Sequence, residues 1–122
     1  MKYLLLMYAN ESIVPKFTPE EHQAVGKAWY AFGEEAKVAG VLLSNNGLCP
    51  VADATAVRVR NGKTVVSDGP FAETHEQLRG YYLFECKDLD EAMHWAVKIP
   101  VAAYGTWHLQ SRLTEHKNDL ER

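Results

Sequence analysis

The sequence has no long apolar runs, no paired cysteines and no strong charge of either sign, and each absence excludes a class of protein. The longest apolar runs are too short to span a membrane. The net charge is −3 and the 13 lysines and arginines are scattered, which argues against nucleic-acid binding. Cys49 and Cys86 form neither a CxxC motif nor a zinc spacing, so we expect a reduced, cytoplasmic setting. Nothing in the pattern indicates a metal or another cofactor.

Apolar periodicity predicts two βαβ units joined by a hairpin. The first helix starts at the capping box Thr18-Pro19-Glu20-Glu21 and ends at Gly40, and the second is capped by Asp88. Asn61-Gly62 is a strong signal for a two-residue hairpin turn, and Asn45-Asn46-Gly47 is expected to be loop. The predicted strands span residues 2–8, 41–44, 55–60, 63–66, 81–86 and 105–113.

This order predicts an α+β, ferredoxin-like domain over residues 1–113, followed by a charged tail over residues 114–122. Right-handed crossovers place both helices on one face of an antiparallel sheet. Residues 2–8 are apolar on both faces, so they read as a fully buried strand whose second face needs cover. We therefore expect a homodimer that packs sheet to sheet.

The stretch from Ser67 to Tyr82 gathers ionisable side chains and backbone turn residues between two strands. Its segment 68–74, Asp-Gly-Pro-Phe-Ala-Glu-Thr, resembles the signature of the DGPF-motif proteins within the YCII-related family. The similarity extends over most of residues 1–113. It is carried also by residues 2–8, 39–42, 57–63, 76–78, 80–82, 99–100 and 104–105.

The resemblance implies a dimeric α/β-barrel built from ferredoxin-like halves, with a cleft whose activity is mostly unassigned. Some YCII-type relatives are enzymes with a suspected His-Asp pair whose histidine lies on the first helix; here that helix carries His22. The resemblance also suggests a gene neighbourhood with alternative sigma factors.

Asp68 and His22 are the candidate catalytic residues, and each has a structural alternative. Asp68 precedes Gly-Pro, where its carboxylate can stabilise a turn through backbone N–H groups or act as a base. His22 falls on the apolar side of the first helix near its start, with its ring expected to point toward the sheet. It is either a packed histidine or a general base.

The candidate substrate-binding residues are polar or aromatic groups near the predicted cleft. Glu73, His75 and Glu76 could converge as an acid–base or metal cluster if their loop curls, although a solvated charged turn is the more common explanation of such a stretch. Tyr82 and Ser44 are expected as pocket groups, and Tyr8 is a further candidate for a cavity wall.

Two functions from different classes remain open at this point. The first is an enzyme that acts on a small molecule by acid–base chemistry, such as elimination or isomerisation, with Asp68 and His22 as the pair. The second is a non-catalytic dimeric module that binds a small ligand or a protein partner, with a link to transcription through a sigma factor. A cleft that joins Asp68 to a histidine would favour the enzyme.

Overall fold

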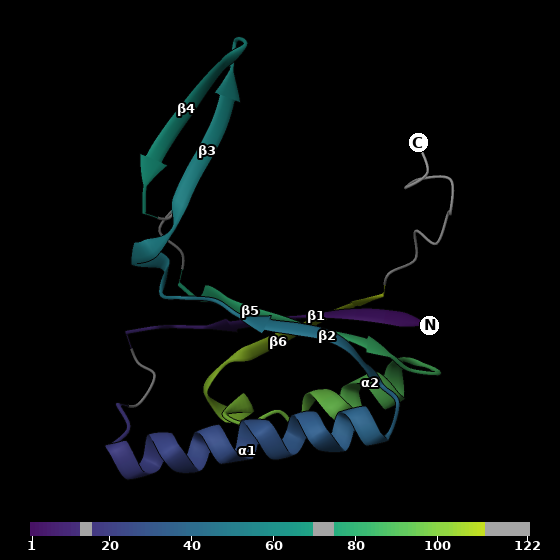
Figure 1. The fold of residues 1–122 in the computed structure, drawn as a ribbon. Coiled ribbons are helices and arrows are strands. Elements are labelled where there is room, and N and C mark those ends of the chain that lie inside the picture. The colour runs from purple at the N-terminus through teal and green to yellow at the C-terminus, as the bar shows by residue number, and fades with distance from the viewer. Residues whose placement is uncertain (13–15, 70–74, 112–122) are drawn as a thin grey trace.

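A computed structural model describes residues 1–12, 16–69 and 75–111 of the chain. Residues 114–122, which were predicted to form a charged tail, lie outside this part. Figure 1 shows a four-stranded sheet with two α-helices below it and a two-stranded hairpin above it. The elements are β1 (Lys2–Ala9), α1 (Pro19–Val38), β2 (Leu42–Gly47), η1 (Val51–Asp53), β3 (Thr55–Arg60), β4 (Lys63–Asp68), β5 (Gln77–Glu85), α2 (Leu89–Ala96), η2 (Ala102–Tyr104) and β6 (Thr106–Ser111).

The sheet has the ferredoxin-like topology that the sequence predicted. Its strand order is β2-β5-β1-β6, and every neighbouring pair is antiparallel. Because β5 separates β1 from β2, and β1 separates β5 from β6, each helical crossover passes over one strand. Both helices lie against the same face (Figure 1), which confirms an α+β fold with helices on one side.

The predicted helix starts are confirmed at atomic level. The Thr18 hydroxyl accepts from the Glu21 backbone N–H at 3.2 Å, and the Glu21 carboxylate accepts from the Thr18 N–H at 2.8 Å. Asp88 caps α2 by accepting from the Glu91 N–H at 2.9 Å. Gly40 ends the first helix with a φ of 76°, which a residue with a Cβ rarely adopts. No helix in the described ranges is both long and apolar enough to cross a membrane.

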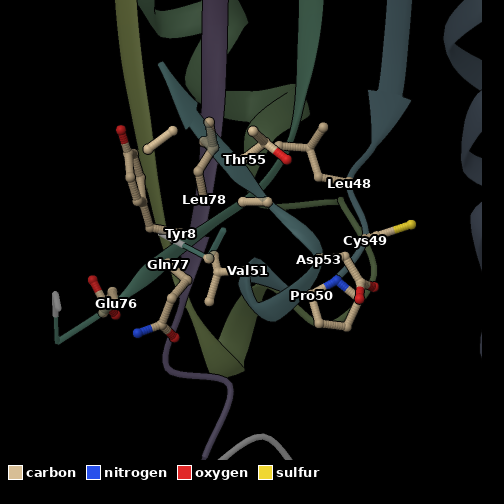
Figure 2. A pocket seen from close by; sticks show the side chains of 13 residues that line it. Tyr8, Leu48, Cys49, Pro50, Val51, Asp53, Thr55, Glu76, Gln77 and Leu78 are labelled. Carbon is tan, nitrogen blue, oxygen red and sulfur yellow. The ribbon is translucent and has the colours of Figure 1, made fainter. Parts of the chain in front are cut away.

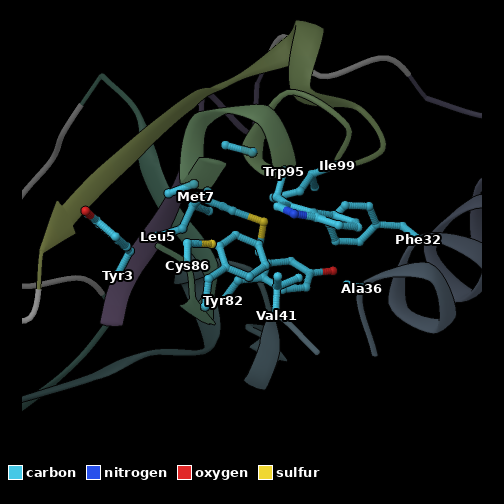
Figure 3. Packing of buried hydrophobic residues seen from close by; sticks show 13 residues of the cluster. Tyr3, Leu5, Met7, Phe32, Ala36, Val41, Tyr82, Cys86, Trp95 and Ile99 are labelled. Carbon is cyan, nitrogen blue, oxygen red and sulfur yellow. The ribbon is translucent and has the colours of Figure 1, made fainter. Parts of the chain in front are cut away.

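The hydrophobic core fills the space between the helices and the sheet (Figure 3). Phe32 of α1 is its central aromatic, since its ring lies edge-on to both Tyr82 and Trp95. The strands contribute every second residue, as a sheet with one covered face requires. The buried cluster consists of Tyr3, Leu5, Met7, Phe32, Ala36, Val41, Tyr82, Phe84, Cys86, Ala92, Trp95, Ala96 and Ile99.

β1 is buried on one face only in the single chain, where the sequence suggested cover on both. Its odd-numbered residues Tyr3 to Ala9 are buried, whereas Leu4, Leu6 and Tyr8 are half-buried. Leu4 pairs with Leu83 of β5, and Leu6 pairs with Tyr81, so these side chains share the face away from the helices. We call this surface the open face.

Two boundaries differ from the prediction because strand pairing overrides local propensity. The segment Asn45-Asn46-Gly47, expected to be loop, completes β2 because Asn46 pairs with Tyr81 and Gly47 with Gly80 of β5. β5 itself begins at Gln77 rather than at Tyr81, so the end of the motif stretch is strand. Backbone pairing with β5 offsets the poor strand propensity of asparagine and glycine in this edge strand.

The hairpin of β3 and β4, which we call the arm, projects from the open side of the sheet, opposite the helices (Figure 1). Its turn is formed by Asn61 and Gly62 with φ of 53° and 75°, as predicted for a two-residue connection. Val57, Val59 and Val66 lie on one side of the arm and are 63%, 62% and 59% exposed. An isolated two-stranded hairpin is only marginally stable in water, so this apolar side lacks cover in a single chain.

Candidate functional site

Two cavities flank Leu48 at one end of the sheet, one on each side. The arm-foot cavity, about 610 Å³, lies where the arm joins the open face and is lined by Tyr8, Thr55, Glu76 and Leu78 among others. The helix-side cavity, about 480 Å³, lies between α1, the sheet and the η2 segment. Both volumes fall within the range of small-molecule sites.

The arm-foot cavity is mainly apolar, with carboxylates at its rim. Figure 2 shows Tyr8, Val51 and Leu78 around it, with Glu76 at one edge and Asp53 at another. The Glu76 carboxylate accepts from the Thr106 hydroxyl at 3.1 Å, which fixes it against the neighbouring strand. Its wall is continuous with the open face, because Tyr8 belongs to both.

The helix-side cavity has an aromatic wall built by α1 and β5. The rings of Trp29 and Tyr82 are nearly parallel, with centroids 6.2 Å apart and 6° between their planes. Burial raises the pKa of the Tyr82 hydroxyl to about 12, so this group remains a protonated phenol at neutral pH. Trp107 of β6 and Tyr104 of η2 add further aromatic surface.

Two polar residues of the helix-side cavity, Arg79 and Trp107, have side chains that can only donate hydrogen bonds. Arg79 of β5 lines it and forms an ion pair through Nη1 with the Glu11 carboxylate. Glu11 is itself held in place, since its backbone N–H donates to the Gln77 side-chain oxygen at 2.9 Å. Asn45 and Asn46 also line the cavity, but the Asn46 side-chain amide donates to the Tyr81 hydroxyl on the open face at 3.3 Å.

His22 lies at the mouth of the helix-side cavity. It is exposed, and its ring stands edge-on to Phe17 with centroids 5.6 Å apart and 82° between the planes. The expectation that this ring points toward the sheet rather than water is therefore wrong in part. Because His22 sits in the first turn and a half of α1, it lies beyond the end of the packed core, where a ligand and solvent can both reach it.

Gly80 permits the close approach of β2 and β5 beside the helix-side cavity. A Cβ at this position would lie 2.5 Å from the Asn46 carbonyl oxygen and 2.9 Å from the Met7 methyl carbon. Its φ of +156° also disfavours any residue with a side chain. The glycine before Tyr81 and Tyr82 in the motif thus has a steric role at the cavity wall.

Val101 carries strain at the same cavity. Its φ of 59° is left-handed, a conformation that β-branched residues rarely adopt. Strained residues of this kind persist where the surrounding structure holds them, and they gather at functional sites. The strained backbone of Val101 is a second, independent feature of the helix-side cavity that is typical of functional sites.

The predicted site residues do not share one site. His22 and Tyr82 meet in the helix-side cavity, whereas Tyr8 lines the arm-foot cavity. Ser44 lies on the open face, where its hydroxyl and that of Tyr81 are 2.7 Å apart. This hydrogen bond is the first cause of a lowered Tyr81 pKa.

Asp68 and His75 are exposed and, among the described residues, line neither cavity. Asp68 is the last residue of β4, opposite Thr55. Glu73, a predicted substrate-binding residue, lies outside the described residues, as does the rest of segment 70–74.

Within one chain, Asp68 and His22 are not brought together. β4, which ends at Asp68, belongs to the arm on the open side, while α1 covers the other side of the sheet (Figure 1). The four-stranded sheet therefore stands between the two groups. A contact between them would have to involve a second copy.

Sequence reasoning missed Arg79, Trp107 and the two asparagines of the helix-side cavity. A signal existed for Arg79, because it is the one charged residue between Leu78 and Glu85 of an otherwise apolar strand. Trp107 read as a core residue of an alternating strand, and only the tertiary structure brings it to the cavity. The two asparagines belong to the segment Asn45-Asn46-Gly47, which the sequence predicted to be a loop.

Comparison with known proteins gives one consistent result. The family model described as "YCII-related domain" matches residues 1–111. A relative named "Uncharacterized protein R00369", from Rhizobium meliloti (strain 1021), is 41% identical over 96 residues, which cover 79% of this chain and 77% of the relative. That relative has no assigned function.

Proposed function

We propose that this chain, which belongs to the YCII-related domain family, binds a small molecule in the helix-side cavity and transfers a proton through His22. The observation that supports the proposal is the shared lining: one cavity of about 480 Å³ is lined by the imidazole of His22, the guanidinium of Arg79 and an aromatic wall. An apolar pocket with a few convergent polar groups is the usual form of a small-molecule site. The family alone assigns no reaction.

His22 suits the proton-transfer role because it combines access with a position at the cavity mouth. An imidazole changes protonation near neutral pH and can accept or donate a proton in turn. Tyr82, kept protonated by burial, can donate a hydrogen bond but cannot act as a base at neutral pH. The assignment of base therefore goes to His22, and the reaction class to elimination or isomerisation at an acidic C–H bond.

Asp68 enters this scheme only from a second copy. Its carboxylate would orient the His22 ring if a partner's arm wrapped around the end of the sheet. The distance between the two groups in a crystal of the assembled protein tests this part, because orientation requires hydrogen-bond reach or one bridging water.

The test of proton transfer does not require the natural substrate. Small aromatic ketones with acidic C–H bonds are incubated with the protein in heavy water, and deuterium incorporation is followed by proton NMR. We expect incorporation with at least one compound, and its loss in His22→Gln. His94→Gln is the matched control, because His94 is exposed on α2 and does not line the cavity.

Equal incorporation in His22→Gln would remove the assignment of His22. If no compound in the panel exchanges, the acid–base role is withdrawn and the cavity becomes a binding site alone. That outcome favours the second function, a ligand- or partner-binding module, including the sigma-factor link that the resemblance suggests. Capture of a purified sigma factor by the intact protein then becomes the next experiment.

We also propose that a second copy covers the open face. Leu4, Leu6 and Leu83 are half-buried there, and the arm projects from the same side of the sheet. Each such side chain contributes about 1.5–3 kcal/mol when it is fully buried, so a second copy stabilises both surfaces together. The two cysteines are free thiols in the structure, which fits the cytoplasmic setting that we propose.

Light scattering during size-exclusion chromatography tests this assembly. We expect a dimer for the unaltered chain and a monomer for Leu6→Glu, whose charge would lie between Tyr81 and His108 at the centre of the open face. Val38→Glu is the matched control, since Val38 is 87% exposed at the end of α1. A monomer at all concentrations in the unaltered chain would refute the assembly.

A further inference from the structure

We propose that the ligand of the helix-side cavity is a carboxylate joined to a flat aromatic or conjugated body, with Arg79 and Trp107 as the groups that recognise the carboxylate. This inference rests on the proposed function, because it assumes that a small molecule enters this cavity. It goes further by stating what the molecule must carry.

The first supporting observation is an unsatisfied donor. The indole Nε1 of Trp107 is buried, and no hydrogen-bond acceptor meets it within the described part of the chain. Trp107 lines the helix-side cavity. An indole N–H can only donate, and buried polar groups without a partner are rare in folded proteins. Because the nitrogen itself has almost no exposed surface, a ligand with an acceptor atom satisfies the group when the Trp107 ring turns it toward the cavity.

The second observation is the state of Arg79. Its ion pair with Glu11 uses Nη1, and a guanidinium carries five N–H donors in one plane. The Arg79 side chain is 38% exposed and lines the cavity, so it is not enclosed by its ion pair. Glu11 fixes the guanidinium, and the remaining donors match the two oxygens of a carboxylate.

Glu11 also sets a limit on the ligand. Its negative charge next to Arg79 leaves the pair neutral, so a ligand with several negative charges meets no excess of positive charge there. The Arg79 guanidinium and the Trp107 indole N–H can only donate, so they still favour a ligand atom that accepts a hydrogen bond over one that donates. A single carboxylate satisfies both conditions, since it accepts from Arg79 and Trp107 and adds only one charge.

The remaining lining selects the body of the ligand. Trp29 and Tyr82 present parallel rings, and Tyr104 and Phe17 also face the cavity. Flat apolar groups pack well against such rings by stacking or edge contacts. A benzene ring with one carboxylate is the smallest molecule that uses both halves of the site.

The experiment uses benzoate as the probe and the tryptophan indole N–H signals of ¹⁵N-labelled protein as the readout. The chain has three tryptophans, and Trp107→Phe identifies the signal of Trp107. We expect benzoate to shift the Trp107 signal strongly and the Trp29 signal as well. Trp95 belongs to the buried core and does not line the cavity, so its signal serves as the internal reference.

Neutral benzamide and two arginine variants separate the parts of the proposal. Benzamide, which has the same shape without the charge, should bind about tenfold more weakly than benzoate. Arg79→Lys keeps the charge but loses the paired donors, so it should weaken benzoate binding by a similar factor and leave benzamide unchanged. Arg60→Lys, at the exposed end of the arm, should change neither.

Each outcome decides between the two proposals. If benzamide and benzoate bind equally, carboxylate recognition is refuted while small-molecule binding in the cavity stands. If neither compound shifts Trp107, the proposal of an aromatic carboxylate fails, while proton transfer through His22 is decided by the deuterium exchange. Should Arg79→Lys not fold, the comparison of benzoate with benzamide on the unaltered chain still gives the answer.

Discussion

Gly80→Ala is the substitution for which the structure predicts the clearest loss of stability. The new Cβ would lie 2.5 Å from the backbone oxygen of Asn46 and 2.9 Å from the Met7 methyl carbon. The Met7 methyl is the end of a flexible side chain and can move, but the Asn46 oxygen is backbone of the paired strand. Relief of the clash therefore requires β2 and β5 to separate.

The magnitude follows from two effects that act at the same atom. Overpacking of this kind costs about 1–3 kcal/mol. A φ of +156° costs a further 1–3 kcal/mol or so for a residue with a Cβ. The sum, about 2–6 kcal/mol, is a large part of the roughly 5–15 kcal/mol that stabilises an ordinary domain. At about 4 °C per kcal/mol for a chain of this size, it corresponds to a fall in Tm of roughly 8–24 °C.

Thermal and urea denaturation followed by circular dichroism measures the effect, with Gly26→Ala as the matched control. Gly26 is exposed within α1 and a Cβ there meets nothing within 4 Å. The same chemical change in a helix interior should stabilise the chain by about 0.5–1 kcal/mol. The reasoning is refuted if Gly80→Ala is as stable as the unaltered chain, or if the two variants change stability in the same direction.

Three further predictions concern the helix cap, the strained residue and the buried tyrosine. Thr18→Ala should lower the free energy of unfolding, measured in urea, by about 1 kcal/mol. The hydrogen bonds of the capping box lower the Glu21 pKa, so the stability that this carboxylate contributes should be present at neutral pH and lost as acid protonates it. This acid-dependent loss should be absent in Glu21→Gln. Val101→Gly should raise the free energy of unfolding by about 1 kcal/mol through relief of its left-handed backbone, and a lower value would show that the valine side chain contributes more than the strain costs. Because burial raises the Tyr82 pKa to about 12, its contribution to stability should be complete below pH 10 and lost as the pH rises toward 12, and Tyr82→Phe should flatten that part of the alkaline denaturation profile.

Local signals in the sequence accounted for most of the fold. The Thr18 and Asp88 caps, the Asn61-Gly62 turn and the alternation along β6 each fix a boundary or a face through contacts within a few residues. The order of these elements then restricts the topology to a ferredoxin-like sheet. The local rules failed at Asn45-Asn46-Gly47, where pairing with a distant strand decides the conformation.

The site was less predictable because it depends on contacts between distant segments. The cavity is lined by residues from distant elements: His22 from α1, Arg79 from β5 and Trp107 from β6. Nothing in the spacing of these residues indicates that they share a cavity. The sequence suggested a pair of Asp68 and His22 because no local pattern shows from which face of the sheet a hairpin projects. In the structure the hairpin and α1 lie on opposite sides of the sheet.

The sheet separates the surface that we propose for assembly from the cavity that we propose for ligand binding. The open face and the arm lie on one side of the sheet, and the helix-side cavity lies on the other. Leu48 lines both the arm-foot cavity and the helix-side cavity, so the two sides meet only at that end of the sheet. Sites without shared contacts respond independently to substitution. Leu6→Glu should therefore abolish the dimer and leave benzoate binding unchanged, while Arg79→Lys should weaken benzoate binding about tenfold and leave the dimer intact. Loss of benzoate binding in the Leu6→Glu monomer would instead show that a partner completes the helix-side cavity.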